Sequence, residues 1–138
     1  MKRNIVLCSH GRLCEGMLDT LELFSLKDEN VYAIPFYTGE ADGEEALKAL
    51  TAGFGEEEIT LLITDVAFGS VNQTVARLFM GKPGYYVISG MNLALVMELA
   101  TMEPADIMEE AVREHVHEAQ SSIAYVPDLF QAASEEDE

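Results

Sequence analysis

The sequence predicts an α/β fold in which helices cover both faces of a mainly parallel, four-stranded sheet. Four short apolar runs of strand length alternate with segments of helical periodicity, and this alternation favours parallel strands joined by helical crossovers. The first and third runs are apolar at consecutive positions, as expected for central strands that are buried on both sides. The four runs are residues 5–8, 31–35, 59–64 and 85–89.

The individual elements follow from their residue patterns. Pro35 places the second run at a sheet edge or a strand end, because proline removes a hydrogen-bond donor from the ladder. Apolar residues recur on helical faces between the runs, and Pro104, which suits a first helical turn, precedes a fifth helix. The predicted order is βαβαβαβαα, to which residues 123–126 could add a last short edge strand. The helical faces comprise Leu13, Met17, Leu21 and Phe24; Leu47, Leu50 and Phe54; Val71, Val75, Leu78 and Phe79; Leu93, Leu95, Val96, Met97 and Leu99; and Ile107, Met108, Ala111 and Val112.

Length and composition indicate one domain. The 138 residues are enough for a single core, and 49% of them are hydrophobic, unlike the composition that keeps a chain disordered. We expect the domain to occupy residues 1–127 and an acidic tail to follow in residues 128–138. Acidic runs of this kind are usually solvated.

The charge and the cysteines limit the partners and the compartment. A net charge of -17 would repel nucleic acid and anionic lipid at long range, so either the partner is a basic protein or the charge mainly confers solubility. The run 5–8 is shorter than a signal-peptide core and no later stretch could cross a bilayer, which predicts a cytoplasmic protein. Cys8 and Cys14 form neither a disulfide framework nor a Cys-x-x-Cys motif, so we expect both to be reduced and buried.

Polar residues at the ends of two predicted strands suggest the site. In open α/β sheets, ligands bind beyond the carboxyl ends of the strands, at the point where the strand order reverses. If the order is 2-1-3-4, the first and third strands are neighbours, and His10 and Asp65 can face each other across one crevice. A carboxylate bonded to one imidazole nitrogen leaves the lone pair of the other free to attack, which suits phosphoryl transfer.

A short loop after the third strand could bind the phosphoryl group. Gly69, Ser70, Val71 and Asn72 precede a predicted helix, where free backbone N–H groups and the helix dipole favour an anion. Ser70 could bond a phosphate oxygen, although Ser70 and Asn72 could equally cap the helix. Asp65 could likewise cap a turn, because aspartate favours turns.

Three segments resemble the IIA domain of the mannose-class (mannose, fructose, sorbose) phosphoenolpyruvate-dependent sugar phosphotransferase system. Residues 5–11, IVLCSHG, look like the first strand and the phosphorylated histidine of that family. Residues 65–72, DVAFGSVN, are similar to its Asp followed by Gly-Gly-Ser-Pro and an Asn, with Phe68 replacing the first glycine and Val71 the proline. Residues 87–93, VISGMNL, resemble its Val-Ile-x-Gly-x-Asn-hydrophobic segment. The segments occur in order on the predicted framework, which makes their combination fairly specific.

The resemblance implies a fold and a function. The fold would be a three-layer, doubly wound sheet with the strand order 2-1-3-4, in a homodimer. The function would be that of a cytoplasmic phosphocarrier, which accepts a phosphoryl group from phospho-HPr on His10, beside Asp65, and passes it to a IIB domain or subunit. Membrane permease subunits would be served indirectly. The resemblance implies a phosphate-binding role for residues 69–72 and no metal or organic cofactor, while the net charge argues against a nucleic-acid partner.

Two alternatives share this fold. The phosphotransfer subunit of the phosphotransferase-dependent dihydroxyacetone kinase also resembles a first-strand histidine ahead of an apolar helix. Residues 90–92 and 70–72 look more like the sugar-transport family. A non-catalytic regulatory module is the second alternative, and it applies if His10 is never phosphorylated.

Other classes fit the sequence less well. A receiver-like phospho-aspartate domain would need an acidic cluster after the first strand and a late lysine, which are missing from the sequence. A cysteine or serine hydrolase is disfavoured because Cys8 lies in an apolar strand and no Gly-x-Ser-x-Gly motif occurs. His115 and His117 point to different helix faces and are expected at the surface. Arg12 could steady a phosphate or be a solvated side chain.

Overall fold

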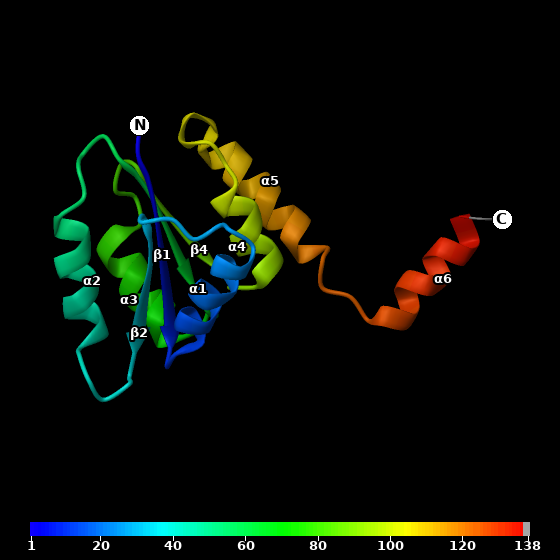
Figure 1. Ribbon diagram of the computed structural model, residues 1–138, viewed down its shortest axis with the longest axis horizontal. Coiled ribbons are helices and arrows are strands. Elements are labelled where there is room, and N and C mark those ends of the chain that lie inside the picture. Colours follow the sequence, from blue (N-terminus) through cyan, green and yellow to red (C-terminus); the bar gives the residue numbers. More distant parts are fainter. Residues whose placement is uncertain (137–138) are drawn as a thin grey trace.

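The parallel sheet has the predicted strand order, β2-β1-β3-β4, and helices cover both of its faces (Figure 1). The computed structural model describes the backbone of residues 1–136 and the side chains of residues 1–131. The predicted α/β fold class is therefore confirmed. The strands are β1 (Arg3–His10), β2 (Val31–Phe36), β3 (Ile59–Thr64) and β4 (Tyr85–Ser89). The helices are α1 (Leu13–Leu23), α2 (Gly43–Ala52), α3 (Ser70–Phe79), α4 (Leu93–Ala100), α5 (Glu109–Gln120) and α6 (Val126–Glu136), with a 3₁₀ turn at Pro104–Asp106.

The sheet separates two apolar cores. Alternate residues of a strand point to opposite faces, so Ile5 and Leu7 of β1 pack with α1, α4 and α5, while Val6 of the same strand packs with α2 and α3. The two helical layers are visible on either side of the sheet in Figure 1. Each fully buried Leu, Ile or Val contributes roughly 1.5–3 kcal/mol relative to an exposed one. Burial on both faces explains why β1 and β3 are apolar at consecutive positions.

The register of the central strands aligns their carboxyl ends. Cys8 of β1 pairs with Thr64 of β3, and His10 pairs with Phe36 of β2. The two residues that follow these strand ends, Tyr37 after β2 and Asp65 after β3, therefore lie at the same edge of the sheet as His10. This edge is the topological switch point, because β1 is joined to β2 on one side and hydrogen-bonded to β3 on the other.

The C-terminal segment differs from the prediction. Residues 123–126 do not form an edge strand, and within the described part of the chain β4 has no neighbour on its outer side. The chain instead leaves the body and continues as α6, away from the sheet (Figure 1). Pro127 has no N–H for a strand ladder but is compatible with a first helical turn, which favours the helix.

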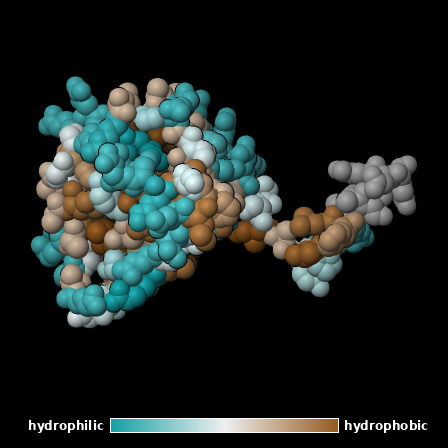
Figure 2. Space-filling model, viewed as in Figure 1, coloured by the Kyte–Doolittle hydropathy of each residue, from teal (hydrophilic) through white to brown (hydrophobic). Residues whose placement is uncertain are grey.

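Helix α6 occupies most of the predicted acidic tail. Residues 128–136 are helical, and residues 137–138 lie outside the described part. The domain boundary at residue 127 stays a prediction. The segment from residue 120 to residue 131 is exposed throughout, and Figure 2 shows hydrophobic side chains on this extension. The exposed hydrophobic residues are Ile123, Tyr125, Val126, Leu129 and Phe130.

Candidate functional site

His10 and Asp65 form a hydrogen-bonded pair at the switch point of the sheet. Nδ1 of His10 lies 2.7 Å from Oδ2 of Asp65, and the main-chain N–H of His10 donates to the same oxygen at 2.8 Å. The other carboxylate oxygen of Asp65 accepts the N–H of Val66 at 3.0 Å. The carboxylate therefore binds the backbone of two strand ends and orients the imidazole as well. The alternative that Asp65 only caps a turn accounts for its hydrogen bond with Val66, but not for the two hydrogen bonds with His10.

The surroundings of Asp65 favour its ionised form. Burial of the side chain, which is 8% exposed, tends to raise the pKa of Asp65. The hydrogen bonds from the His10 N–H, the His10 ring and the Val66 N–H outweigh burial and hold that pKa below its ordinary value. An ionised carboxylate only accepts hydrogen bonds, so in the neutral imidazole of His10 the proton is on Nδ1 and the lone pair is on Nε2. The imidazole side chain is 43% exposed, and among its described polar neighbours Nε2 has Oγ of Ser70 at 3.2 Å.

The N-terminus of α3 faces the open nitrogen of His10. Ser70 is the first residue of this helix, and its Oγ lies 3.2 Å from Nε2. The N-cap residue is Gly69, which has no side chain to occupy the first N–H groups of the helix. A Cβ on Gly69 would lie 2.8 Å from Cγ2 of Val66 and 3.0 Å from Cε1 of His10. This close approach favours glycine and brings the helix N-terminus, whose free N–H groups could accommodate an anion, against the imidazole.

Val71 and Asn72 direct their side chains away from Nε2. Val71 is fully buried in the core between the sheet and helices α2 and α3. The side chain of Asn72 accepts from Oγ1 of Thr64 at 2.8 Å and donates to the carbonyl of Ala67 at 3.0 Å, which braces the loop after β3. A contact of either residue with a bound anion would run through the main-chain N–H. The N-cap lies at Gly69, so neither Ser70 nor Asn72 caps α3.

The two departures from the family motif are compatible with this loop. Phe68 is 97% exposed and directs its ring into solvent. The loop closes through a hydrogen bond from the N–H of Gly69 to the carbonyl of Val66 at 3.1 Å. Val71 supplies core volume at the second position of the helix.

Tyr37 is a site residue that the sequence analysis missed. Its hydroxyl lies 2.8 Å from Oγ of Ser70, and its ring centroid lies 5.4 Å from that of His10. The residue follows β2, next to the pair formed by Phe36 and His10. Its position could have indicated a site residue, because Tyr37 directly follows β2, which neighbours β1 in the predicted strand order.

Arg12 is bound by carboxylates and is not free to face the site. Its guanidinium donates to Glu15 at 3.1 and 3.2 Å and to Glu40 at 2.9 Å. The solvated alternative agrees with the structure, because about half of the side chain is exposed and both of its carboxylate partners are themselves exposed. The first turn of α1 is held instead by Ser9, whose Oγ accepts the N–H of Cys14 at 2.9 Å.

The remaining candidates lie elsewhere. Cys8 and Cys14 are free and buried as predicted, and burial raises the pKa of both thiols, which disfavours a cysteine nucleophile. His115 was expected at the surface but is half-buried, because α5 packs on α4 and brings its Nδ1 within 3.5 Å of Glu98. His117 is exposed.

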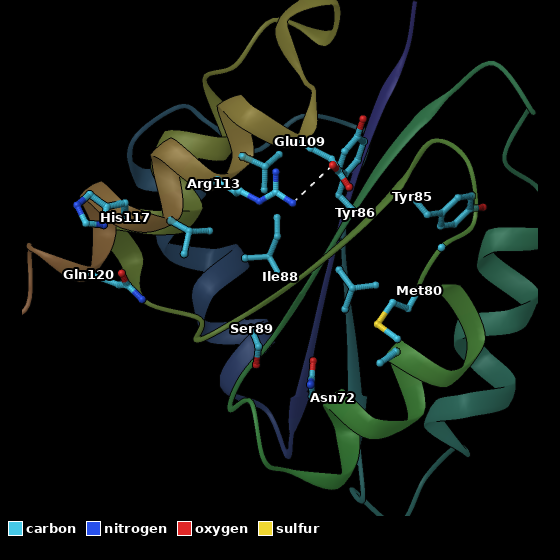
Figure 3. A pocket seen from close by; sticks show the side chains of 15 residues that line it. Asn72, Met80, Tyr85, Tyr86, Ile88, Ser89, Glu109, Arg113, His117 and Gln120 are labelled. Carbon is cyan, nitrogen blue, oxygen red and sulfur yellow. Dashed lines mark ion pairs between the residues drawn. The ribbon is translucent and has the colours of Figure 1, made fainter.

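A groove of about 620 Å³ runs along the free edge of β4, between α3 and α5 (Figure 3). Met80, Tyr86 and Ile88 line its apolar part, and an ion pair between Glu109 and Arg113 lies at one end. Asn72 lines this groove, but His10, Asp65 and Ser70 do not, so the groove lies beside the histidine–aspartate pair and does not contain it. Among the described residues, no helix combines the length and apolar character that a membrane span needs.

Fold and site together define a class of protein. A parallel α/β sheet with a histidine–aspartate pair beside a helix N-terminus is suited to holding an anionic group at the histidine. The family described as the PTS system fructose IIA component, EIIA-man, matches residues 4–118. The chain belongs to this family, the mannose-class IIA components of the sugar phosphotransferase system.

Individual relatives agree with this family. The chain is 35% identical over 96 residues to the sorbose-specific EIIA component of Klebsiella pneumoniae, which covers 68% of this chain and 70% of that protein. It is 31% identical over 97 residues to the mannose-specific EIIAB component of Escherichia coli K12, which covers 68% of this chain but only 30% of that longer protein.

Solved structures share the fold. A crystal structure from Klebsiella pneumoniae, described as a phosphoenolpyruvate-dependent sugar phosphotransferase system permease, has a TM-score of 0.85 and 31% identity, covering 94% of this chain and 95% of that one. The IIA protein associated with the fucose utilization operon of Streptococcus pneumoniae has a TM-score of 0.79, covering 94% and 97% of the two chains. At 24% identity, the second comparison supports the fold alone.

Proposed function

We propose that this chain is a phosphocarrier that accepts a phosphoryl group on Nε2 of His10 from phospho-HPr and passes it to a IIB domain or subunit. The observation that carries the proposal is the 2.7 Å hydrogen bond between Nδ1 of His10 and Asp65, which leaves Nε2 as the free nucleophile. The family assignment supports the same role. The choice of sugar would depend on the later components of the system, which include the membrane permease subunits.

The transfer conserves atoms and charge. The lone pair of Nε2 forms a bond to phosphorus while the bond between phosphorus and the donor's histidine nitrogen breaks. The ring of His10 keeps its proton on Nδ1 and becomes cationic, and the carboxylate of Asp65 stabilises this charge. In the step to IIB, a nucleophile of the acceptor forms a bond to phosphorus while the bond to Nε2 breaks, and its electron pair returns to the ring of His10. The phosphoryl oxygens would lie at the N–H groups of residues 69–72 and the hydroxyl of Ser70, because such transfers depend on positioning and charge stabilisation.

The partners would dock around His10. Tyr37, Val66 and Phe68 on neighbouring loops, with Leu13 at the start of α1, are exposed apolar or aromatic residues near the strand ends that carry the site. Exposed apolar patches of this kind are typical of interaction surfaces. The net charge of -17 favours basic surroundings on the partner's site. We place this exchange in the cytoplasm.

We further propose a homodimer. The outer edge of β4 exposes a groove, and α6 exposes hydrophobic side chains that the described part of this chain leaves uncovered. An unpaired sheet edge and an uncovered apolar helix are both surfaces that proteins usually bury. A second copy of the chain would supply matching surfaces by symmetry.

The two alternatives of the same fold remain testable. The names of the relatives, sorbose-specific EIIA and mannose-specific EIIAB, favour sugar transport over a subunit of a dihydroxyacetone kinase. A regulatory module without phosphorylation would not require a histidine that is oriented by a carboxylate with its second nitrogen at a helix N-terminus.

One assay tests the proposal. The chain is incubated with phosphoenolpyruvate, enzyme I and HPr, and its mass is followed for a gain of one phosphoryl group that is acid-labile and base-stable. His10→Ala should abolish the gain, whereas His117→Ala, which changes an exposed histidine on α5, should retain it. Labelling that survives His10→Ala would refute the assignment.

A further inference from the structure

A chain of hydroxyl groups reaches the open nitrogen of His10. The Tyr37 hydroxyl lies 2.8 Å from Oγ of Ser70, which lies 3.2 Å from Nε2 of His10. Tyr37 has a φ of 64°, in the left-handed region that bulky residues rarely adopt. This conformation places the phenol ring beside the imidazole. Residues in strained backbone conformations cluster at functional sites, which makes Tyr37 a candidate for a functional role.

The protons of this chain can be assigned from chemistry. An ionised Asp65 only accepts hydrogen bonds, so in the neutral imidazole, the form that can act as nucleophile, the proton is on Nδ1 and Nε2 can only accept. The hydroxyl of Ser70 must therefore donate its one proton to Nε2. Ser70 Oγ then serves as the acceptor towards Tyr37, whose hydroxyl is the donor. All four groups are satisfied by a single direction of donation, from Tyr37 through Ser70 to His10 and from His10 to Asp65.

We propose that Tyr37 is a positioning residue for phosphoryl transfer, which acts by donating a hydrogen bond to Ser70 and so directs the Ser70 proton at the acceptor beside it. The inference rests on the proposed function. Before transfer the acceptor is the lone pair of Nε2. After transfer that lone pair is in the nitrogen–phosphorus bond, and the Ser70 proton turns to a phosphoryl oxygen. The Tyr37 hydroxyl keeps its own proton throughout, so no further acid or base is needed.

The charges near His10 explain why neutral hydrogen-bond donors such as the hydroxyls of Tyr37 and Ser70 would be important for holding a phosphoryl group. Arg12 is engaged by Glu15 and Glu40, so the phosphoryl group would be held by N–H and O–H donors. A hydroxyl that accepts a hydrogen bond becomes a stronger donor, and hydrogen bonds to a charged acceptor are stronger than those to a neutral one. Loss of the Tyr37 donor should therefore weaken the phosphorylated state more than the free state.

The test compares Tyr37→Phe with Tyr32→Phe. Tyr32 lies in β2, half-buried against Phe54, so its variant loses a hydroxyl of the same kind away from His10. We expect Tyr37→Phe to lower the rate of transfer from phospho-HPr about two- to tenfold, the range for one net hydrogen bond, and to shift the equilibrium towards phospho-HPr. Tyr32→Phe should change neither.

Two further measurements separate positioning from a structural role. In the unphosphorylated protein, ¹⁵N NMR of His10 should show a shift of Nε2 in Tyr37→Phe, while Nδ1 stays protonated and bonded to Asp65. In a double-mutant cycle, Tyr37→Phe should have no further effect on the rate in a Ser70→Ala background, because it acts through Ser70.

The outcomes distinguish this inference from the proposed function. No labelling of the unsubstituted protein would refute the phosphocarrier role, and the NMR shift of Nε2 would still decide whether Tyr37 acts on His10 through Ser70. Normal labelling with equal rates and equal Nε2 shifts in the two phenylalanine variants would overturn the role of Tyr37. A Tyr37→Phe effect that is undiminished in Ser70→Ala would also overturn it.

Discussion

The same oxygen of Asp65, Oδ2, accepts both the main-chain N–H and the ring Nδ1 of His10, at 2.8 and 2.7 Å. Oδ2 of Asp65 therefore sets both the position of the His10 backbone and the orientation of the His10 ring. A ring held in this way need not reorient before Nε2 reacts, although the Ser70 hydroxyl must release Nε2, and the fixed orientation lowers the cost of reaching the reactive geometry. Asp65 in turn is held by the strand end of β3, so the sheet itself aligns the pair.

Replacing the carboxylate should slow transfer without unfolding the protein. In Asp65→Asn the amide can present its NH₂ to Nδ1, which favours the wrong tautomer and stabilises a cationic ring poorly. We expect the rate of phosphorylation by phospho-HPr to fall on the order of 100-fold. The control is Asp106→Asn, which changes an exposed aspartate in the 3₁₀ turn. An unchanged rate, with circular dichroism confirming the fold, would make Asp65 a structural residue.

The same carboxyl should make stability depend on pH. Its pKa is lowered in the folded state, so the unfolded state binds more protons as the pH falls. The stabilisation is therefore present above the pKa of the unfolded chain and is lost as the pH falls through the lower pKa of the folded chain. Urea unfolding between about pH 5 and pH 2 should show the stability difference between the unsubstituted protein and Asp65→Asn shrinking. A difference that stays constant over this window would contradict the pKa shift.

Gly69 should be intolerant of a side chain for a reason specific to the site. Gly69→Ala places a Cβ within 3.0 Å of the His10 ring and closer still to Val66, so the ring or the loop must move. A displacement of this size should reduce transfer by about tenfold or more. Gly16→Ala is the matched control, because it has open space in α1 and should stabilise the helix by about 0.5–1 kcal/mol. Equal transfer rates in the two variants would refute the close approach as a functional feature.

Salt should slow the encounter with phospho-HPr. Exposed charges farther apart than about 8 Å are largely screened at physiological ionic strength, so steering by the acidic surface should weaken as salt rises. Stopped-flow measurements should show a falling association rate while circular dichroism stays constant. Removal of residues 134–138 should matter little if the steering charges lie near His10. A rate that is flat with salt would show that docking depends on apolar contacts and that the charge of -17 serves solubility.

The proposed homodimer should depend on the apolar side of α6. Phe130 is 73% exposed on the extension, and Phe130→Ser should weaken association by removing apolar area that a second copy would cover. The control is Leu23→Ser, which removes a leucine of comparable exposure, 82%, at the end of α1. Sedimentation velocity over a range of concentrations should shift towards monomer for Phe130→Ser only. A monomer at every concentration in the unsubstituted chain would refute the dimer.

The order of strands and helices from β1 to α5 could be predicted from the sequence alone, whereas α6 could not. Strands buried on both faces, such as β1 and β3, have consecutive apolar residues, and helices buried on one face have apolar residues at helical spacing. The local pattern of apolar residues was therefore enough to predict the type and order of these elements. His10 and Asp65 were predictable for the same reason, because each lies at the end of a recognisable strand and parallel strands bring their carboxyl ends to one edge.

The tertiary structure decided the features that depend on packing between distant segments. Tyr37 joins the site through its conformation and its contact with Ser70, which the local pattern of β2 does not encode. Asn72 braces a loop instead of capping a helix because Thr64 of β3 lies within hydrogen-bonding distance. His115 is half-buried because α4 packs against α5. Residues 123–126 have strand-like composition, but a strand needs a partner edge, and the chain leads this segment away from β4. The spacing of apolar residues indicates which face of an element is buried, whereas these contacts depend on which elements pack against one another.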